Sequence, residues 1–130
     1  MAIIKVADLG ISSGVSTPAF STSLNSNQSL TSSTYTKVIF DTEIYDTDSA
    51  YDTSTGRFTC PTGKTGKYIF TATVSMSSNF TYVQVDFYKN GSSIYRGTAI
   101  RNDTSATSVT ATINLSASDY VEVFCFQDST

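Results

Sequence analysis

Apolar and polar residues alternate along several stretches of this chain, which is the pattern of a β-strand with one buried face. The clearest stretch is residues 68–76, where Tyr, Phe, Ala, Val and Met alternate with Ile, Thr and Ser. Residues 82–88 and 109–115 alternate in the same way, and residues 120–127 are predicted to form the last strand. No helix of normal length is visible between them. The pattern therefore predicts an all-β fold of short strands, typical of a sandwich.

Turn signals separate these stretches. Asn90-Gly91 is a strong hairpin dipeptide, so residues 94–100 are expected to return as one strand beside residues 82–88. Residues 35–40 are predicted to form a further strand, and residues 41–52 an acidic loop. The carboxylates of this loop are weak candidates for a calcium site at Asp46, Asp48 and Asp52. Their spacing matches no EF-hand, so we expect a solvated acidic surface, no metal and no cofactor.

The composition of the chain argues against several classes of function. The net charge of −3 argues against a nucleic-acid partner, because such proteins concentrate Lys and Arg. No apolar run has the length needed to span a membrane, and the first residues lack the apolar core of a signal peptide. The chain has no His, no phosphate-binding loop and no nucleophile elbow. We therefore expect a protein that is not an enzyme and that is synthesised and assembled in the cytoplasm.

Residues 1–17 form a distinct segment that we call the arm, and residues 18–130 form the domain. The apolar side chains of the arm are Ile3, Ile4, Val6, Leu9 and Ile11. The segment is too short and too rich in Gly to be stable as a lone helix. Two interpretations stay open. The arm is a strand or flap on its own domain, or it anchors the domain onto a neighbouring subunit or carrier structure.

A central stretch resembles the signature of the C1q-like and tumour-necrosis-factor-like superfamily. The matching residues are Tyr51-Asp52, Thr55-Gly56, Phe58, Cys60-Pro61, Gly66, Tyr68 and Phe70. Flanking matches are Pro18-Ala19-Phe20-Ser21, Phe40-Asp41-Thr42, Lys89-Asn90-Gly91 and residues 115–121, with Ser118 where Gly is usual. The resemblance covers roughly residues 18–127. It implies a two-sheet antiparallel jelly-roll sandwich that forms homotrimers.

The resemblance has one departure. Family members continue to a final strand that lies inside a sheet, whereas this sequence ends at Thr130. An open gap in a sheet would leave backbone donors and acceptors unpaired, so we expect it to be filled. Either the sequence is a fragment, or the arm fills the gap, from its own chain or from a neighbour.

The resemblance also indicates which apolar residues face the core or the trimer seam and which face outward. Those expected in the core or at the trimer seam are Phe40, Phe58, Tyr68, Phe70, Val85, Phe87, Ile113, Val121 and Val123. The opposite faces of two strands that the family places side by side carry Tyr82, Tyr88, Phe124 and Phe126. These four are predicted to form an outer aromatic contact patch. Cys60 and Cys125 fall on inward positions and are expected to be core thiols, with a disulfide between neighbouring strands as the alternative.

Roughly a third of the chain is Ser or Thr. Domains of this superfamily with that character resemble those of bacteriophage structural proteins. We therefore expect a homotrimeric capsid decoration (cement) protein or short head fibre on the virion surface, in contact with the major capsid protein or with fibre or tail proteins. The first alternative is a trimeric fibre tip or adhesin that binds a host surface glycan. The second is a secreted signalling ligand of the tumour-necrosis type.

Overall fold

Strand β6 (Gly66–Ser75) shows directly how the alternating sequence becomes structure. In the computed structural model, which describes residues 17–78, 80–101 and 106–129, every second residue of β6 is buried. Strand β10 (Ala106–Leu115) has the same pattern and pairs with β6 antiparallel over all ten residues. The two strands therefore bury one apolar face and expose one Ser/Thr face, as side chains of period two require.

The other strands are shorter or more irregular. They are β1 (Phe20–Ser23), β2 (Thr34–Val38), β3 (Thr42–Asp46), β4 (Tyr51–Asp52), β5 (Arg57–Thr59), β7 (Tyr82–Lys89), β8 (Ser92–Arg96), β9 (Ile100–Arg101) and β11 (Tyr120–Asp128). All the strand pairs are antiparallel, and the described residues contain no helix. This part of the chain therefore contains no helix that is long and apolar enough to cross a bilayer.

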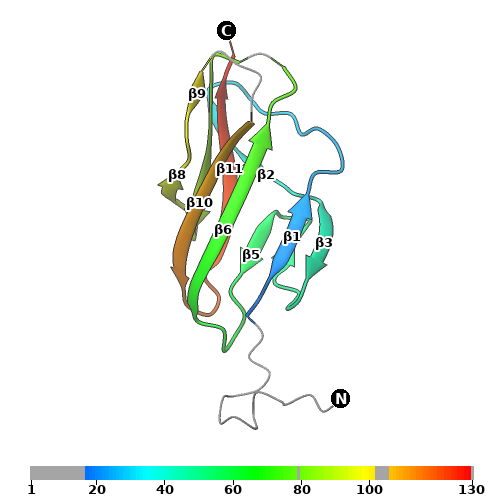
Figure 1. Ribbon diagram of the computed structural model, residues 1–130, viewed down its shortest axis with the longest axis vertical. Helices are drawn as coiled ribbons and strands as arrows, with labels where there is room; N and C mark the ends of the chain where they lie inside the picture. Colours follow the sequence, from blue (N-terminus) through cyan, green and yellow to red (C-terminus); the bar gives the residue numbers. More distant parts are fainter. Residues whose placement is uncertain (1–16, 79, 102–105, 130) are drawn as a thin grey trace, which may run out of the picture.

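One layer of the fold is a continuous sheet, which we call the complete sheet. Its order is β4-β5-β11-β7-β8, with β2 also paired to β11 and β9 to β7. β11 is its central strand: β7 pairs along one edge, while β5 and then β2 pair along the other. Figure 1 shows β11 behind β6 and β10.

The facing layer consists of two separate two-stranded sheets, β1–β3 and β6–β10, which we call the split layer. The core lies between the two layers, and buried Phe58, Phe70 and Phe87 are among its largest side chains. Ring centroids of Phe58 and Phe70 are 5.3 Å apart, and those of Phe70 and Phe87 are 5.9 Å apart. The layers and pairings confirm the all-β jelly-roll sandwich that the sequence predicted.

Two sequence predictions about local structure were wrong. The acidic stretch 41–52 contains two strands, β3 and β4, rather than a loop. β3 is held by its ladder to β1 and leaves Ile44 and Tyr45 exposed, so its sequence lacks the alternation of a half-buried strand. The return strand after the Asn90-Gly91 hairpin is also interrupted, because it divides into β8 and β9. Gly97 lies in the break, where an added Cβ would lie only 2.5 Å from the carbonyl oxygen of Val85.

Candidate functional site

The outward face of the complete sheet carries a cluster of aromatic rings, which we call the aromatic face. Its members are Tyr35 of β2, Tyr82 and Tyr88 of β7, and Phe124 and Phe126 of β11, and all are half-buried. The ring centroids of Tyr88 and Phe124 are 4.0 Å apart, and those of Tyr82 and Phe126 are 5.7 Å apart. Tyr35 joins the two pairs, at 6.2 Å from Tyr88 and 5.0 Å from Phe126. The result is one contiguous apolar surface.

A polar network lies within the aromatic face. The side chain of Asp86, 0% exposed, accepts a hydrogen bond of 2.7 Å from Gln84 Nε2 at its Oδ1. Gln84 Oε1 in turn accepts a hydrogen bond from the Tyr82 hydroxyl. Within the described chain, Asp86 Oδ2 has no hydrogen-bond donor and lies 3.9 Å from Arg96 Nε. Burial, and then the Asp86 charge, raise the pKa of the Tyr88 hydroxyl, so the ring stays a neutral donor.

A second buried carboxylate lies beside the aromatic face. Glu122 is 5% exposed, and its Oε1 is 3.0 Å from both Lys37 Nζ and Arg57 Nη2. The Arg57 guanidinium also stacks 3.8 Å from the ring centroid of Tyr120. The carboxylate therefore pairs with two cationic side chains. Such a group ties β2, β5 and β11 together and is poorly suited to proton transfer.

The two cysteines are free and buried. The backbone N–H of Cys60 donates to the carbonyl of Asp119, six residues before Cys125 on the way into β11. At about 3.3 Å per strand residue, the two thiols are roughly 20 Å apart, too far for a disulfide. Burial and the Asp86 charge raise the pKa of the Cys125 thiol to about 11. This thiol is therefore protonated at neutral pH and is a poor nucleophile.

The weak metal candidates serve the turns instead. Asp46 Oδ2 accepts a 2.7 Å hydrogen bond from the backbone N–H of Tyr51, and Asp52 Oδ1 accepts one of 2.8 Å from Ser54. Asp48 Oδ2 lies 3.8 Å from Lys64 Nζ. Across residues 17–78, 80–101 and 106–129, no group of three or more His, Cys, Asp or Glu side chains is arranged to hold a metal ion.

The predicted core positions lie between the layers of a single chain. Buried members are Phe58, Tyr68, Phe70, Val85, Phe87, Ile113 and Val121, while Phe40 and Val123 are half-buried against them. The arm residues Ile3, Ile4, Val6, Leu9 and Ile11 lie outside the described residues. Two features of the aromatic face were missed from the sequence: the bridging ring of Tyr35 and the full burial of Asp86. Tyr35 shares its strand parity with Lys37, but only the ladder to β11 reveals its neighbours.

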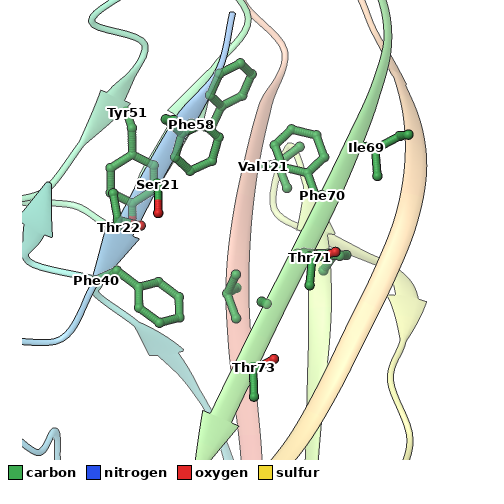
Figure 2. A pocket seen from close by; sticks show the side chains of 15 residues that line it. Ser21, Thr22, Phe40, Tyr51, Phe58, Ile69, Phe70, Thr71, Thr73 and Val121 are labelled. Atoms are coloured by element: carbon green, nitrogen blue, oxygen red, sulfur yellow. The ribbon is translucent and has the colours of Figure 1, made fainter. Parts of the chain in front are cut away.

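A groove separates the two halves of the split layer. It has a volume of about 330 Å³ and lies between β1 and β6, with Val121 and Val123 of β11 and Phe40 among its lining residues. Figure 2 shows Ser21 and Thr22 on one wall, Thr71 and Thr73 on the other, and Val121 between them. The lining combines apolar side chains with backbone edges and includes no charged side chain. Such a lining suits a polypeptide segment better than a small polar substrate.

Comparison with known proteins places residues 19–129 within the family described as the C1q domain. The structure is also similar to the globular domain of the zebrafish complement 1qA protein, with a TM-score of 0.65 and 22% sequence identity. That match covers 86% of this chain and 89% of the zebrafish chain. No curated protein matches the sequence.

Proposed function

The chain belongs to the C1q domain family, and from this premise we propose that it is a homotrimeric structural protein of a bacteriophage virion. C1q domains form trimers and are typically not enzymes. In this proposal the protein is a capsid decoration protein or a short head fibre on the virion surface, assembled in the host cytoplasm. Its partners are the major capsid protein or fibre or tail proteins.

The aromatic face is the observation that best supports a role in attachment to a partner. Five half-buried rings form one surface on the outward side of the complete sheet. Contiguous apolar patches on soluble domains mark interaction sites, and aromatic side chains dominate the binding energy of interfaces. The surface therefore fits a protein partner whose side chains cover the rings in the assembled particle.

The chemistry of the buried groups supports a role without catalysis. The chain has no His to act as a base near neutral pH. Glu122 is neutralised by Lys37 and Arg57, and the Cys125 thiol is protonated. These groups contribute to the architecture of the sheet and offer no activated nucleophile.

The oligomeric state is the first test of the proposal. Multi-angle light scattering of the purified full chain at micromolar concentration should give a mass three times that of the 14.0 kDa chain. A monomer at that concentration would contradict the homotrimer.

The particle itself is the second test. Electron microscopy of intact particles from the source of the gene, labelled with an antibody against this protein, should show label on the virion surface. Replacing Phe124 and Phe126 with Ser should leave a folded trimer but strongly reduce incorporation. The matched control is Tyr45→Ser, which removes an exposed ring on β3, away from the aromatic face. The virion role fails if purified particles lack the protein or if the double variant is incorporated normally.

Host-glycan binding is the second candidate, favoured by one specific feature. Tyr82 and Tyr88 place half-buried rings with phenol hydroxyls on the aromatic face, beside the rings of Phe124 and Phe126. Sugar ligands place flat apolar faces against such rings and hydrogen-bond to the polar groups beside them, so the combination suits them. Binding of the trimer on a glycan array, lost in Tyr82→Ala and in Tyr88→Ala, would favour this role. Absence of binding across the array would leave the decoration role as the better account.

A further inference from the structure

The groove in the split layer has the geometry of a vacant strand position. β1 and β6 point in the same direction on either side of it. Each is hydrogen-bonded on its far side, β1 to β3 and β6 to β10, and the described residues form no ladder between β1 and β6. Residues along a strand direct their N–H and C=O groups to the two edges in alternation. Both facing edges therefore present backbone donors and acceptors that a strand between them would satisfy.

The floor of the groove requires apolar side chains from its occupant. Phe20 and Phe40 are only half-buried there, although both pack against the core. Val121, Val123 and Phe87 complete the floor. The volume of about 330 Å³ is roughly twice that of a cavity of about 150 Å³ that holds benzene. A strand with two or three apolar residues on one side would fill it.

We propose that residues 7–11 of this same chain occupy the groove as a strand antiparallel to both β1 and β6. The insertion joins the two pairs of the split layer into one five-stranded antiparallel sheet, in the order β3-β1-arm-β6-β10. The proposal concerns the fold of the domain and does not depend on the virion role.

The pattern of the segment fits the groove. Ala7, Leu9 and Ile11 share one side of a strand, and Asp8 and Gly10 share the other. The first three would face the floor and the other two would face solvent. This order matches the groove, whose floor is apolar and whose outer rims are Ser21, Thr71 and Thr73.

The connection favours the same chain over a neighbour. The described structure begins at Thr17, and buried Pro18 leads directly into β1 at one wall of the groove. The start of β1 is fixed, since Ala19 N–H donates to Thr47 Oγ1 at 3.0 Å and the Ala19 carbonyl accepts from Thr47 N–H at 3.0 Å. Residues 12–18 contain Ser, Gly and Pro, which suit a chain reversal. A segment tethered beside its groove has an effective concentration in the millimolar range, which favours intramolecular docking.

Hydrogen exchange of the full chain, followed by mass spectrometry, tests the insertion. Leu9→Asp would place a carboxylate on the apolar floor, so amides of β1 and β6 should exchange roughly tenfold faster or more. Gly10→Asp introduces the same charge at the next residue, whose side chain would face solvent. This variant should leave the exchange of β1 and β6 unchanged. Exchange in β7 and β11 is the internal reference. Equal behaviour of the two variants would overturn the proposal.

Disulfide trapping is a second test of the insertion, and it does not require the Leu9→Asp variant to fold. Asp8→Cys is combined in turn with Cys at Ile69, Thr71 or Thr73, which face outward along β6. Mild oxidation should link one of these pairs within a single chain, whereas Asp8→Cys with Thr112→Cys, one strand farther away on β10, should stay unlinked. The native cysteines are buried and do not compete. A product of twice the chain mass shows insertion from a neighbouring copy, and the absence of product with every pair shows that the arm does not lie beside β6. Either result overturns the proposal.

Discussion

Both layers of this sandwich contribute buried side chains to the core, but they differ in completeness and in their outward faces. The complete sheet pairs its central strand β11 on both edges and carries aromatic rings and buried carboxylates outward. The split layer is divided by a groove, and the outward face of its β6–β10 pair is rich in Ser and Thr, with the Thr71 and Thr110 hydroxyls 3.0 Å apart. The complete sheet thus presents a continuous aromatic face, whereas the split layer has unpaired strand edges on both sides of its groove.

The core between the layers should show the largest effect of any single substitution. Phe58 of β5, in the complete sheet, contacts rings in both halves of the split layer: its centroid is 5.1 Å from that of Phe20 in β1 and 5.3 Å from that of Phe70 in β6. We expect Phe58→Ala to lower the free energy of unfolding by about 3–5 kcal/mol, because it leaves a cavity where the layers meet. Thermal or denaturant unfolding of the protein measures the loss.

The control for this substitution is Ile69→Ala. Ile69 is a large aliphatic residue of β6 but is 77% exposed on the outward face of the split layer. Its replacement should change stability by about 0.5 kcal/mol or less. If Phe58→Ala lowered the free energy of unfolding as little as Ile69→Ala, Phe58 would not pack between the two layers as described.

The ion cluster of the complete sheet should give the next largest effect. Glu122→Gln removes the charge that Lys37 and Arg57 share and leaves the two cations close together. We expect a loss of about 1.5–3 kcal/mol in the free energy of unfolding, since hydrogen bonds to buried charged groups are in that range. Glu43→Gln on exposed β3 of the split layer is the matched control and should be nearly neutral. Equal effects of the two would mean that Glu122 does not tie the strands of the complete sheet together.

The two layers also differ in how well their sequences predict them. The strands β6, β7 and β10 were predicted because one face of each packs on the core, and burial imposes alternation on the sequence. β3 was missed because both of its faces are largely exposed and its only constraint is backbone pairing with β1. Pairing leaves little trace in side chains.

The same limit applies to the candidate site. Parity along β7 and β11, together with the side-by-side position that the family resemblance implies for these strands, put Tyr82, Tyr88, Phe124 and Phe126 on one face. Tyr35 comes from a strand distant in sequence, and its place beside them follows from the register between β2 and β11. The burial of Asp86 depends on the rings that surround it, which no local pattern encodes. The position of Tyr35 and the burial of Asp86 both depend on the register between strands distant in sequence, which the local pattern of residues does not give.

A single ring can test how far the aromatic face acts as one unit. Tyr35 links the Tyr88–Phe124 pair to Phe126, so Tyr35→Ala should separate the cluster into two parts. We expect a loss of about 1–2 kcal/mol, from partial burial and aromatic contacts of about 0.5–1.5 kcal/mol each. Tyr45→Ala, on β3 and 51% exposed, is the control of the same residue type. Chemical denaturation measures both, and a Tyr35→Ala variant as stable as the control would show that the rings act independently.

The smallest expected effect is a pH dependence at the turn that joins the two layers. Asp119 lies between β10 of the split layer and β11 of the complete sheet, and its carboxylate accepts hydrogen bonds from the Asn90 side chain at 2.8 Å and the Ser116 backbone at 2.9 Å. These bonds and nearby Lys89 lower the pKa of Asp119 from 3.8 to about 2. Because the folded pKa lies below the ordinary value, the stabilisation is complete above about pH 4 and is lost as the pH falls towards 2. Asp119→Asn should therefore reduce the slope of stability against pH between pH 4 and 2 while leaving the slope above pH 5 unchanged. Melting temperatures of both proteins across this range measure the difference, and parallel curves would show that the turn does not couple the layers through this charge.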